Sequence, residues 1–411
     1  MHKLVQNLKY AGRMLVKSPG FTAIAVFTLA LGIGANTAIF TVVNEALLRP
    51  RPGIGEPDRL VDIGRSDRGR GFDNMSYPNF RDYREHNRSL SGAAALMIEP
   101  RPMSLGTDQG SERIYANLVS GNYFDVLQVK PYMGRFFLPE EDRTPGTHPV
   151  VVLSHSYWRQ RFQSDRGVVG REIKLNGLGY TVVGVASPEF RGTVPIAMDA
   201  WIPMMMASQA LVSRDILECR ECSFMVGIGR LKPGVSAGQA NAEALAISAS
   251  LASEYPKENR EKGIAVTTSR LLPGELAQII GAFLGMLMAI VGLVLVIASV
   301  NVAGMMLVRA STRRREIAVR LAIGARRGEI ARQFLTEGVL VFLAGGAAGL
   351  LLAVWMRNAL LTLLPVLPFP VIVDLNLDWR VLTFALSVSL LAGAVASLIP
   401  ALQASRPDVE G

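Results

Sequence analysis

Three groups of side chains in this sequence are of types and at spacings that could do chemistry. Cys219 and Cys222 form a C-x-x-C motif, which could hold a disulfide, a redox couple or part of a zinc site. Ser154 and His155 combine a nucleophile with a base. The run Glu140–Asp142 places three carboxylates side by side, as general acid–base chemistry could use.

The C-x-x-C motif contains the only two cysteines of the chain. A redox-active pair usually opens a helix in a βαβ unit, whereas this pair leads into the strand-like segment Ser223–Leu231. Zinc takes about four ligands, and His86, His148 and His155 are too scattered to supply them. We predict a local disulfide or free thiols, with redox activity and metal binding as the alternatives. We expect no metal centre and no cofactor.

The other two groups do not form a catalytic constellation. Neighbouring Ser154 and His155 would point apart on a strand or a helix, and the three acids follow a proline as turn residues do. The sequence has no G-x-x-x-x-G-K-[ST] phosphate loop, no G-x-S-x-G elbow and no H-E-x-x-H motif. We therefore predict that the chain is not an enzyme, and that any ATPase is a separate chain. A membrane-tethered enzyme is the disfavoured alternative.

Four long uncharged runs dominate the chain. A bilayer core about 30 Å thick takes roughly 20 apolar residues as a helix, so each run is predicted to span the membrane. The first could instead be a signal peptide, but its apolar stretch is longer than such a peptide needs. The runs are Ser18–Asn44, Leu276–Val308, Gly338–Met356 and Val381–Ser405.

The distribution of positive charge predicts the orientation of these spans. The segment before the first span carries a net charge of +4, and the segment 309–332 carries +6. Lys and Arg near span ends remain cytoplasmic, so both segments and both termini are predicted to be cytoplasmic. The block Arg49–Glu275 is then outside. It has 28 basic and 26 acidic residues, without the basic patch that nucleic-acid binding requires.

The predicted class is a membrane α-helical protein of four transmembrane helices with an inserted α+β extracytoplasmic domain. The chain divides into a cytoplasmic amphipathic helix (1–20), the first span (21–48), the extracytoplasmic domain (49–276), the second span (277–308), a cytoplasmic coupling helix (309–332), the third span (333–356), an extracytoplasmic loop (357–380), the fourth span (381–402) and a cytoplasmic tail (403–411). The N-terminal helix is expected to lie on membrane lipid.

The outer block mixes strand and helix patterns. Val150–Leu153 reads as a strand and Ser154–Phe162 as the helix after it. Asn176-Gly177 is the favoured two-residue turn of a hairpin, which joins Glu172–Leu175 to Tyr180–Val185. Further along, Ser223–Leu231 reads as a strand, and Val235–Tyr255 as a long helix with Ser236 as its N-cap.

The connector between the second and third spans contains an amphipathic pattern with start and stop signals. Ser311 or Thr312 could cap a helix that ends at Ile323, and a second helix would begin at Arg327. A basic loop that only fixes topology and contacts anionic lipid is the alternative. We predict a docking helix for a cytoplasmic ATPase, with contacts from Arg313, Arg314, Arg315, Glu316, Ile317, Arg320, Leu321 and Gly324.

Small residues recur at close-packing spacing in two spans. Gly281 and Gly285 form a G-x-x-x-G motif in the second span, and Gly345 and Gly349 form one in the third. This spacing lets membrane helices approach closely, so we predict helix packing at these four glycines. Glu337 begins the third span and is predicted to sit at the interface near Arg332 or Arg315.

Several of these stretches resemble one family in their residues and in their order. Arg315–Ala325 reads REIAVRLAIGA and matches the signature R-E-I-[GA]-[VI]-R-[RKL]-A-[LI]-G-A. The chain resembles the MacB/FtsX-type permeases of ABC systems, and among them a duplicated "orphan" branch with a MacB-like periplasmic core domain. The other matching stretches are Gly32–Phe40, Gly134–Phe137, Pro139–Asp142, Val151–Ser154, Leu175–Gly177 and Val182–Val185.

The resemblance implies a mechanism and a set of partners. Two permease units would face each other as a homodimer or pseudo-dimer, and a separate ATPase would dock on the coupling helix. ATP-driven closure would pass along the first two spans to the outer domain, in an inner-membrane efflux or mechanotransmission complex that could include a periplasmic adaptor. The duplicated branch carries two halves, so this chain is expected to be a single-unit relative or an N-terminal half. A non-transport regulator of an envelope enzyme is the alternative function.

Overall fold

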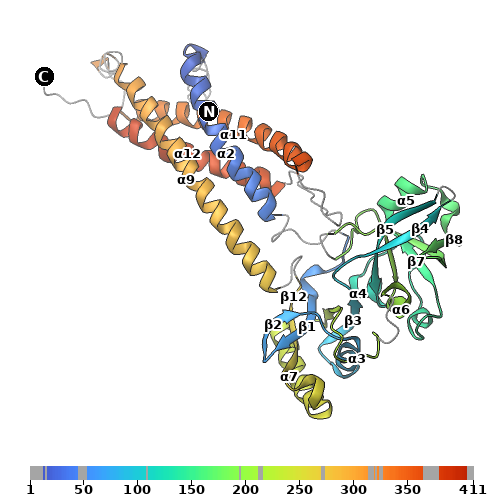
Figure 1. Cartoon of the computed structure of the whole chain (residues 1–411). Helices are drawn as coiled ribbons and strands as arrows, with labels where there is room; N and C mark the ends of the chain where they lie inside the picture. Colours follow the sequence, from blue (N-terminus) through green and yellow to red (C-terminus); the bar gives the residue numbers. More distant parts are fainter. Residues whose placement is uncertain are drawn as a thin grey trace. The chain divides into compact units, whose positions relative to one another are not determined.

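The computed structural model describes residues 13, 16–44, 53–107, 110–193, 196–211, 216–269, 274–312, 319, 322–323, 327–363 and 379–404. The chain separates into two compact units (Figure 1). The helical unit comprises Met1–Leu48, Ile280–Val366 and Asp374–Gly411, and the sheet unit comprises Arg49–Ile279 and Leu367–Val373.

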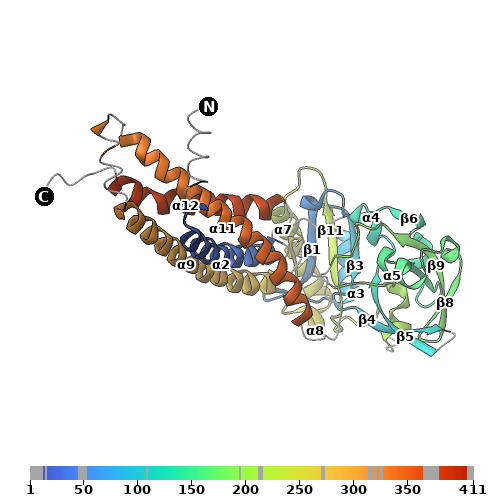
Figure 2. The ribbon, with the colours of Figure 1, turned by 90° about the horizontal axis from the view of Figure 1, so that it is seen from above.

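The helical unit contains four helices that are long and apolar enough to cross a membrane, among the residues that the structure describes. Figure 2 shows α2 lying beside both α9 and α11. Buried leucine, valine, phenylalanine and alanine side chains from all four helices form one core. The helices are α2 (Pro19–Val43), α9 (Gly274–Thr312), α11 (Arg327–Leu363) and α12 (Trp379–Ala404).

These helices follow the four uncharged runs, and α9, α11 and, by two residues, α12 extend beyond theirs. Helix α11 begins at Arg327, as predicted for the helix that leads into the third span. Its charged first turns continue into the apolar part without interruption. Helix α9 continues to Thr312 instead of ending near Val308. The extension begins with Arg309 and Ala310, and arginine and alanine are both strong helix formers. The N-terminal amphipathic helix predicted for residues 1–20 lies almost wholly outside the described residues.

The sheet unit is built on one mixed sheet, whose described part has the strand order β10-β7-β9-β8-β4-β5-β3-β11-β1-β12. Outside this order, β2 pairs with β1 and β6 pairs with β9. The pairs β7–β9 and β10–β5 are parallel, and the other pairs are antiparallel. The strands are β1 (Leu60–Asp67), β2 (Arg70–Asp73), β3 (Leu90–Leu96), β4 (Arg101–Thr107), β5 (Gly110–Val119), β6 (Pro131–Gly134), β7 (Val150–Leu153), β8 (Glu172–Leu175), β9 (Leu178–Ala186), β10 (Ala200–Pro203), β11 (Val226–Leu231) and β12 (Lys262–Thr268).

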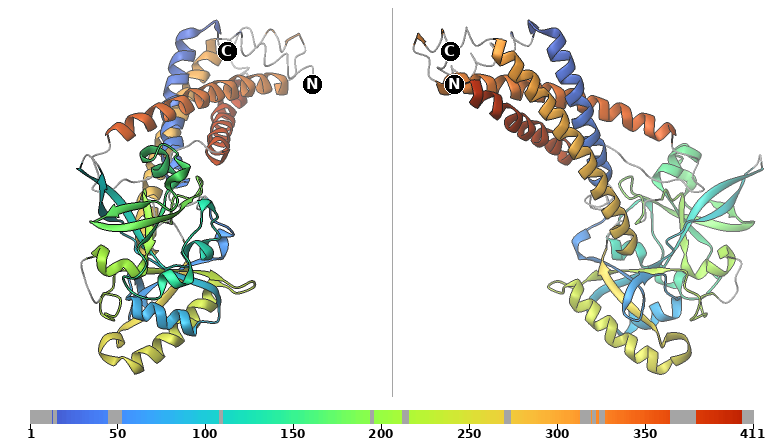
Figure 3. Two further views of the ribbon diagram at one scale, coloured as in Figure 1. Left: turned by 90° about the vertical axis from the view of Figure 1, so that its right-hand side faces the viewer. Right: turned by 60° about the vertical axis from the view of Figure 1, so that its left-hand side comes forward.

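Helices cover the sheet and complete the α+β architecture. Figure 3 shows α7, in yellow, beside α3 below the strands. The α-helices are α3 (Tyr77–His86), α4 (Tyr123–Leu127), α5 (His155–Arg161), α6 (Ala207–Leu211), α7 (Ala237–Glu254) and α8 (Pro256–Asn259). The short 3-10 helices are η2 (Pro57–Arg59), η3 (Pro139–Asp142), η4 (Arg166–Val168) and η5 (Met204–Met206).

Both faces of the central strands are buried. Successive side chains of a strand point to opposite faces, and in β3 Ala93 and Ala95 enter one core while Ala94 and Leu96 enter the other. The same alternation occurs in β7, and β9 also contributes side chains to both cores. Strands buried on both faces read as continuous apolar runs, which explains why the run Val150–Leu153 could be recognised in the sequence.

The local predictions for this unit agree closely with the structure. Strand β7 has the expected bounds, and Asn176 and Gly177, both with positive φ, form the turn between β8 and β9. Ser236 caps α7 by accepting a hydrogen bond from the Gln239 N–H. The strand expected at Ser223–Leu231 begins only at Val226, because the three residues before it follow the loop that holds the two cysteines.

Candidate functional site

The residues predicted to dock an ATPase, 313–317, 320–321 and 324, all lie outside the described residues, so their docking role remains a prediction. The helices on either side are described. The Ser311 hydroxyl donates to the Val308 carbonyl over 2.7 Å, and the Thr312 hydroxyl donates to that of Arg309 over 2.9 Å. Both residues therefore belong to the last turn of α9. The prediction that one of them caps the start of a separate helix is wrong.

An ion pair joins the ends of α9 and α11 beside this connector. Arg309 Nη1 lies 3.0 Å from Glu337 Oε1, and the two side chains are only 15% and 4% exposed. Glu337 thus pairs with Arg309, which the sequence analysis did not name as its partner; of the two arginines that it did name, Arg315 lies outside the described residues and Arg332 is exposed. Arg332 precedes Glu337 by five residues, which places the two on different faces of a helix with 3.6 residues per turn.

The same arginine also contacts the start of α2. Its guanidinium lies 4.7 Å from the centre of the Phe21 ring, a cation–π distance. Its Nη2 donates to the hydroxyl of Ser18, the residue that precedes α2. Arg309 therefore connects three of the four long helices at one end of the helical unit. Removing one member of a buried ion pair leaves an uncompensated charge, which is strongly destabilising.

The glycines of the third span lie against α2. A Cβ atom added to Gly345 would lie 2.5 Å from the Cβ atom of Leu29, and one added to Gly349 would lie 2.9 Å from the backbone nitrogen of Gly34. Gly285 of the second span has no such neighbour, because a Cβ atom added to it would meet nothing within 4 Å. Gly281 is half-buried.

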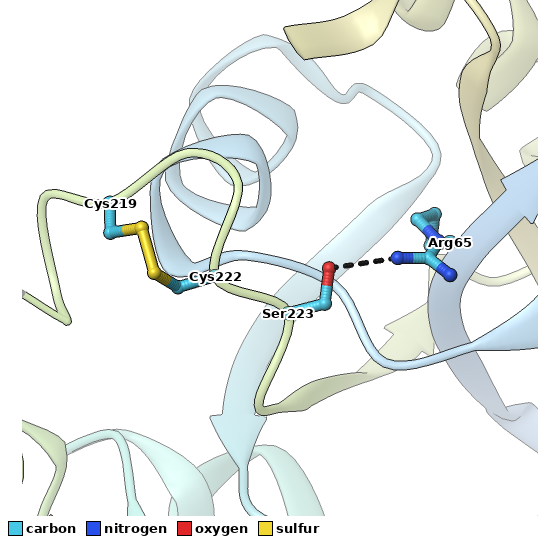
Figure 4. Close-up of a disulfide and its surroundings, with 4 residues drawn as sticks. All are labelled: Arg65, Cys219, Cys222 and Ser223. Atoms are coloured by element: carbon cyan, nitrogen blue, oxygen red, sulfur yellow. Dashed lines mark hydrogen bonds between the residues drawn. A yellow bond between two sulfur atoms is a disulfide. The ribbon is translucent and has the colours of Figure 1, made fainter.

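The two cysteines form a disulfide in the sheet unit (Figure 4). Next to it, the Ser223 hydroxyl accepts a hydrogen bond of 3.1 Å from Arg65 Nη1. Arg220 lies inside the disulfide loop. Its Nη1 atom is 2.7 Å from a carboxylate oxygen of Asp82, and its guanidinium lies 3.6 Å from the centre of the Tyr255 ring. The loop therefore holds α3 close to the end of α7.

The groups considered for catalysis have structural partners instead. The Ser154 hydroxyl caps α5 by accepting from the Tyr157 N–H. Burial lowers the pKa of His155, and the charge of Arg159 lowers it further. Glu141 accepts from both terminal nitrogens of Arg135, at 2.7 and 2.9 Å. Within the described ranges, no cluster of three or more His, Cys, Asp or Glu side chains could hold a metal ion.

Asp142 is a carboxyl group of the sheet unit with a raised pKa. Burial raises its pKa to about 6, although hydrogen bonds from the backbone of Gly121 and Met205 favour the charged form and act in the opposite direction. The Gly121 N–H donates to Asp142 Oδ2 over 2.7 Å. This carboxylate joins the turn before α4 to η3 and η5, so its position indicates a structural role.

Sequence reasoning missed the contacts that join the long helices. Asn36 is 4% exposed in the middle of α2 and donates through Nδ2 to the Gly32 carbonyl and to the Val291 carbonyl of α9, both over 2.8 Å. The available signal was a lone asparagine within an apolar run, because polar side chains inside the membrane often join helices. Arg309 was counted only as part of the basic connector.

Comparison with known proteins identifies two regions. Residues 22–247 match the MacB-like periplasmic core domain, and residues 278–409 match the FtsX-like permease C-terminal domain. The chain is 29% identical to the macrolide export ATP-binding/permease protein MacB of Salmonella typhi over 300 residues. This matched segment covers 72% of this chain and 42% of that protein. The chain thus spans less than half the length of these relatives.

A second relative and one solved structure are also similar to this chain. The MacB protein of Escherichia coli is 28% identical over 299 residues, which cover 71% of this chain and 42% of that protein. The crystal structure of the periplasmic region of MacB from Actinobacillus actinomycetemcomitans is 15% identical with a TM-score of 0.38, and covers 53% of this chain and 91% of that one. Because the core-domain match alone takes in more than half of its residues, the chain belongs to the MacB/FtsX-type family of ABC permeases, which are multi-pass inner-membrane proteins with a periplasmic domain.

Proposed function

We propose that this chain is the transmembrane subunit of an ABC-type efflux or mechanotransmission complex. In this proposal a separate cytoplasmic ATPase hydrolyses ATP, and the helical unit passes the resulting movement to the extracytoplasmic sheet unit. The observation that carries the proposal is the continuity of α9. It is one helix of 39 residues that begins shortly after the last strand and ends at the basic connector.

The length of α9 supports a mechanical role. A helix rises 1.5 Å per residue, so α9 is roughly 58 Å long, whereas the hydrocarbon core of a bilayer is only about 30 Å thick. A single uninterrupted helix of this length reaches well beyond the membrane. It can therefore tilt as one rod and displace the chain at its other end.

We place the connector 309–332 and both termini in the cytoplasm. The segments before α2 and after α9 are strongly basic, and basic segments near span ends remain on the cytoplasmic side. The disulfide of the sheet unit supports the same orientation, because disulfides persist in oxidising compartments outside the cytoplasm.

We further propose that two such units pair through α9. Seven of the ten large exposed apolar residues in the described part of α9 alternate at spacings of four and three, which is the heptad pattern of a coiled-coil seam, while Val294, Val296 and Val308 lie off it. Asn301 continues this exposed face, and a polar residue in a membrane seam can hydrogen-bond across helices. The seam residues are Ile279, Phe283, Met286, Ile290, Leu293, Ile297 and Val300.

A periplasmic adaptor could complete the complex.

The pairing can be tested by disulfide cross-linking of the full chain in membranes, with both native cysteines replaced by serine. Ile297→Cys, at a position 61% exposed, should give a cross-linked dimer. Leu295→Cys, at a position 8% exposed on the opposite side of the same helix, should not. Equal yields from the two positions would refute pairing through this seam.

Co-purification tests ATPase docking. The tagged full chain is isolated from membranes, and P-loop ATPases are identified and assayed for ATP hydrolysis in the eluate. Arg314→Glu, Arg315→Glu and Arg320→Glu together should remove the ATPase. The charge-matched control reverses Arg68, Arg70 and Arg166, which are exposed in the sheet unit, and should retain it. Retention by both variants would disprove docking at the connector.

A further inference from the structure

Two polar ties hold α2 against α9. The first is the pair of hydrogen bonds from Asn36, one of which reaches the Val291 carbonyl of α9. The second is the contact of Arg309 of α9 with the Ser18 hydroxyl and the Phe21 ring. Glu337 fixes the guanidinium of this second tie from a third helix.

The ties lie in the same register. Ser18, directly before α2, and Asn36 within α2 are 18 residues apart, and Val291 and Arg309 of α9 are also 18 residues apart. Between them, a Cβ atom added to Gly32 would lie 3.3 Å from the Cα atom of Leu295. Gly32 precedes Asn36 by four residues, and Leu295 follows Val291 by four. Three independent contacts thus describe one antiparallel alignment without a slip.

The contacts between the ties would not fix that alignment by themselves. They involve small and apolar residues such as Ala25, Gly32, Ala298 and Val302, and similar residues recur at each turn of both helices. Within a bilayer there is no hydrophobic driving force that would distinguish one register from the next. A slide by one helical turn of about 5.4 Å would replace one set of apolar contacts by another.

We propose that Asn36 and Arg309 are positioning residues that lock the register of α2 and α9, so that the two helices move as one lever. A slide would break both ties together, and would leave the Asn36 amide and the Arg309 guanidinium without these partners in an apolar environment. Only the statement that the two helices transmit movement as a lever rests on the proposed function. The lock itself is a property of the helical unit alone.

Cross-linking in membranes tests the lock, without any ATPase. In the full chain with both native cysteines replaced by serine, Ala25→Cys with Val302→Cys reports the observed register, because both positions are fully buried in the shared core. Ala25→Cys with Ala298→Cys reports a register one turn away. We expect only the first pair to cross-link while the ties are intact.

The test variant combines Asn36→Leu, Ser18→Ala and Phe21→Leu, which removes both ties and leaves the ion pair between Arg309 and Glu337 in place. We expect the shifted pair to gain cross-linking at the expense of the first pair. An unchanged pattern in this variant would overturn the proposal.

The matched control is Thr37→Val. Thr37 is fully buried next to Asn36, but its hydroxyl donates to the Ile33 carbonyl of its own helix over 2.7 Å. Its loss removes a buried polar group without touching α9, so the native cross-linking pattern should persist. A pattern shifted as strongly as in the test variant would also overturn the proposal, because the register would then depend on general packing.

A final arm separates the lock from the proposed function. In the native complex, ATP should change the cross-linking of positions in the sheet unit. In the test variant, ATPase binding should be retained while this ATP-dependent change is lost. Absence of any ATPase in the native preparation would refute the proposed function and leave the register result standing. An ATP response that survives in the test variant would refute the lever.

Discussion

At the scale of single residues, the buried charges of the sheet unit have well-defined structural roles. Arg230 is 4% exposed in β11, and its guanidinium donates to the backbone carbonyls of Val126, Gly55 and Glu56. Such a side chain ties the segment that follows the first span to the core of the sheet. Buried polar groups of this kind cost little when every donor has a partner and much when one partner is removed.

Asp142→Asn should stabilise the protein at neutral pH. Because burial raises the pKa of this carboxyl from 3.8 to about 6, the folded state favours the protonated form. The stability that this form contributes is complete below pH about 4 and is lost as the pH rises through about 6. A shift of this size corresponds to roughly 2–3 kcal/mol.

The measurement is urea unfolding of the full chain in detergent between pH 4 and pH 8. The difference between Asp142→Asn and the native protein should be near zero at pH 4 and should grow in favour of the variant towards pH 8. A difference that does not depend on pH would contradict the assignment.

Arg220→Met should destabilise the sheet unit by about 2 kcal/mol or more. The substitution leaves the half-buried Asp82 without its guanidinium, and removes the contact with the Tyr255 ring. The comparison is Arg68→Met, whose ion pair with Glu261 is 75% and 61% exposed; it should change the free energy of unfolding by less than about 0.5 kcal/mol. Equal effects in urea unfolding at pH 7 would show that the disulfide loop does not depend on Arg220.

At the scale of elements, the glycine motifs of the two spans have different surroundings. Gly345 and Gly349 of α11 lie where α2 passes, and Gly34 of α2 approaches the Gly349 backbone in return. Gly285 of α9 is exposed. Close packing at this spacing is therefore observed at Gly345 and Gly349 of the third span and not at Gly285 of the second.

Gly349→Ala should loosen the contact between α2 and α11, because the new methyl group would lie 2.9 Å from the Gly34 nitrogen and 3.0 Å from the Ala30 carbonyl oxygen. Backbone atoms cannot rotate away as side chains do, so we expect a loss of about 1–3 kcal/mol. Thermal unfolding in detergent measures this loss. Gly285→Ala is the matched control and should leave the melting temperature unchanged; a similar drop in both variants would argue against a packing role.

At the scale of the whole molecule, two units of different character share one chain. The helical unit has one apolar core drawn from four helices, and the sheet unit has two cores on opposite faces of its sheet. Helix α9 begins six residues after Thr268 and runs to the basic connector. The mechanism that we propose needs those two ends to lie on opposite sides of the membrane.

Accessibility labelling checks this orientation. In a chain whose native cysteines are replaced by serine, Ser253→Cys, exposed on α7, should react with a membrane-impermeant maleimide added to cells whose outer membrane has been opened. Ser311→Cys, exposed at the end of α9, should react only after the inner membrane is also permeabilised. Labelling of Ser311→Cys before that step would reverse the topology and remove the connector from reach of any cytoplasmic ATPase.

The sequence by itself determined the class of this protein, the position of its long helices and that of several elements of the sheet unit. Apolar runs of spanning length, the asymmetry of basic residues, an Asn-Gly turn and a serine N-cap are local signals, because each depends on the bilayer or on neighbouring residues. For this reason α2, α12, β7, the β8–β9 hairpin and α7 lie where the sequence predicted them.

Only the tertiary structure decided which partners these elements have. Glu337 pairs with an arginine 28 residues before it, and Asn36 bonds to a carbonyl 255 residues away. Such distances in sequence carry no periodic signal, because they depend on how helices are aligned in space. The same holds for the glycines, since identical spacing in α9 and α11 meets open space at Gly285 and backbone at Gly349. What a residue touches is set by the neighbouring helix, which its own segment does not encode.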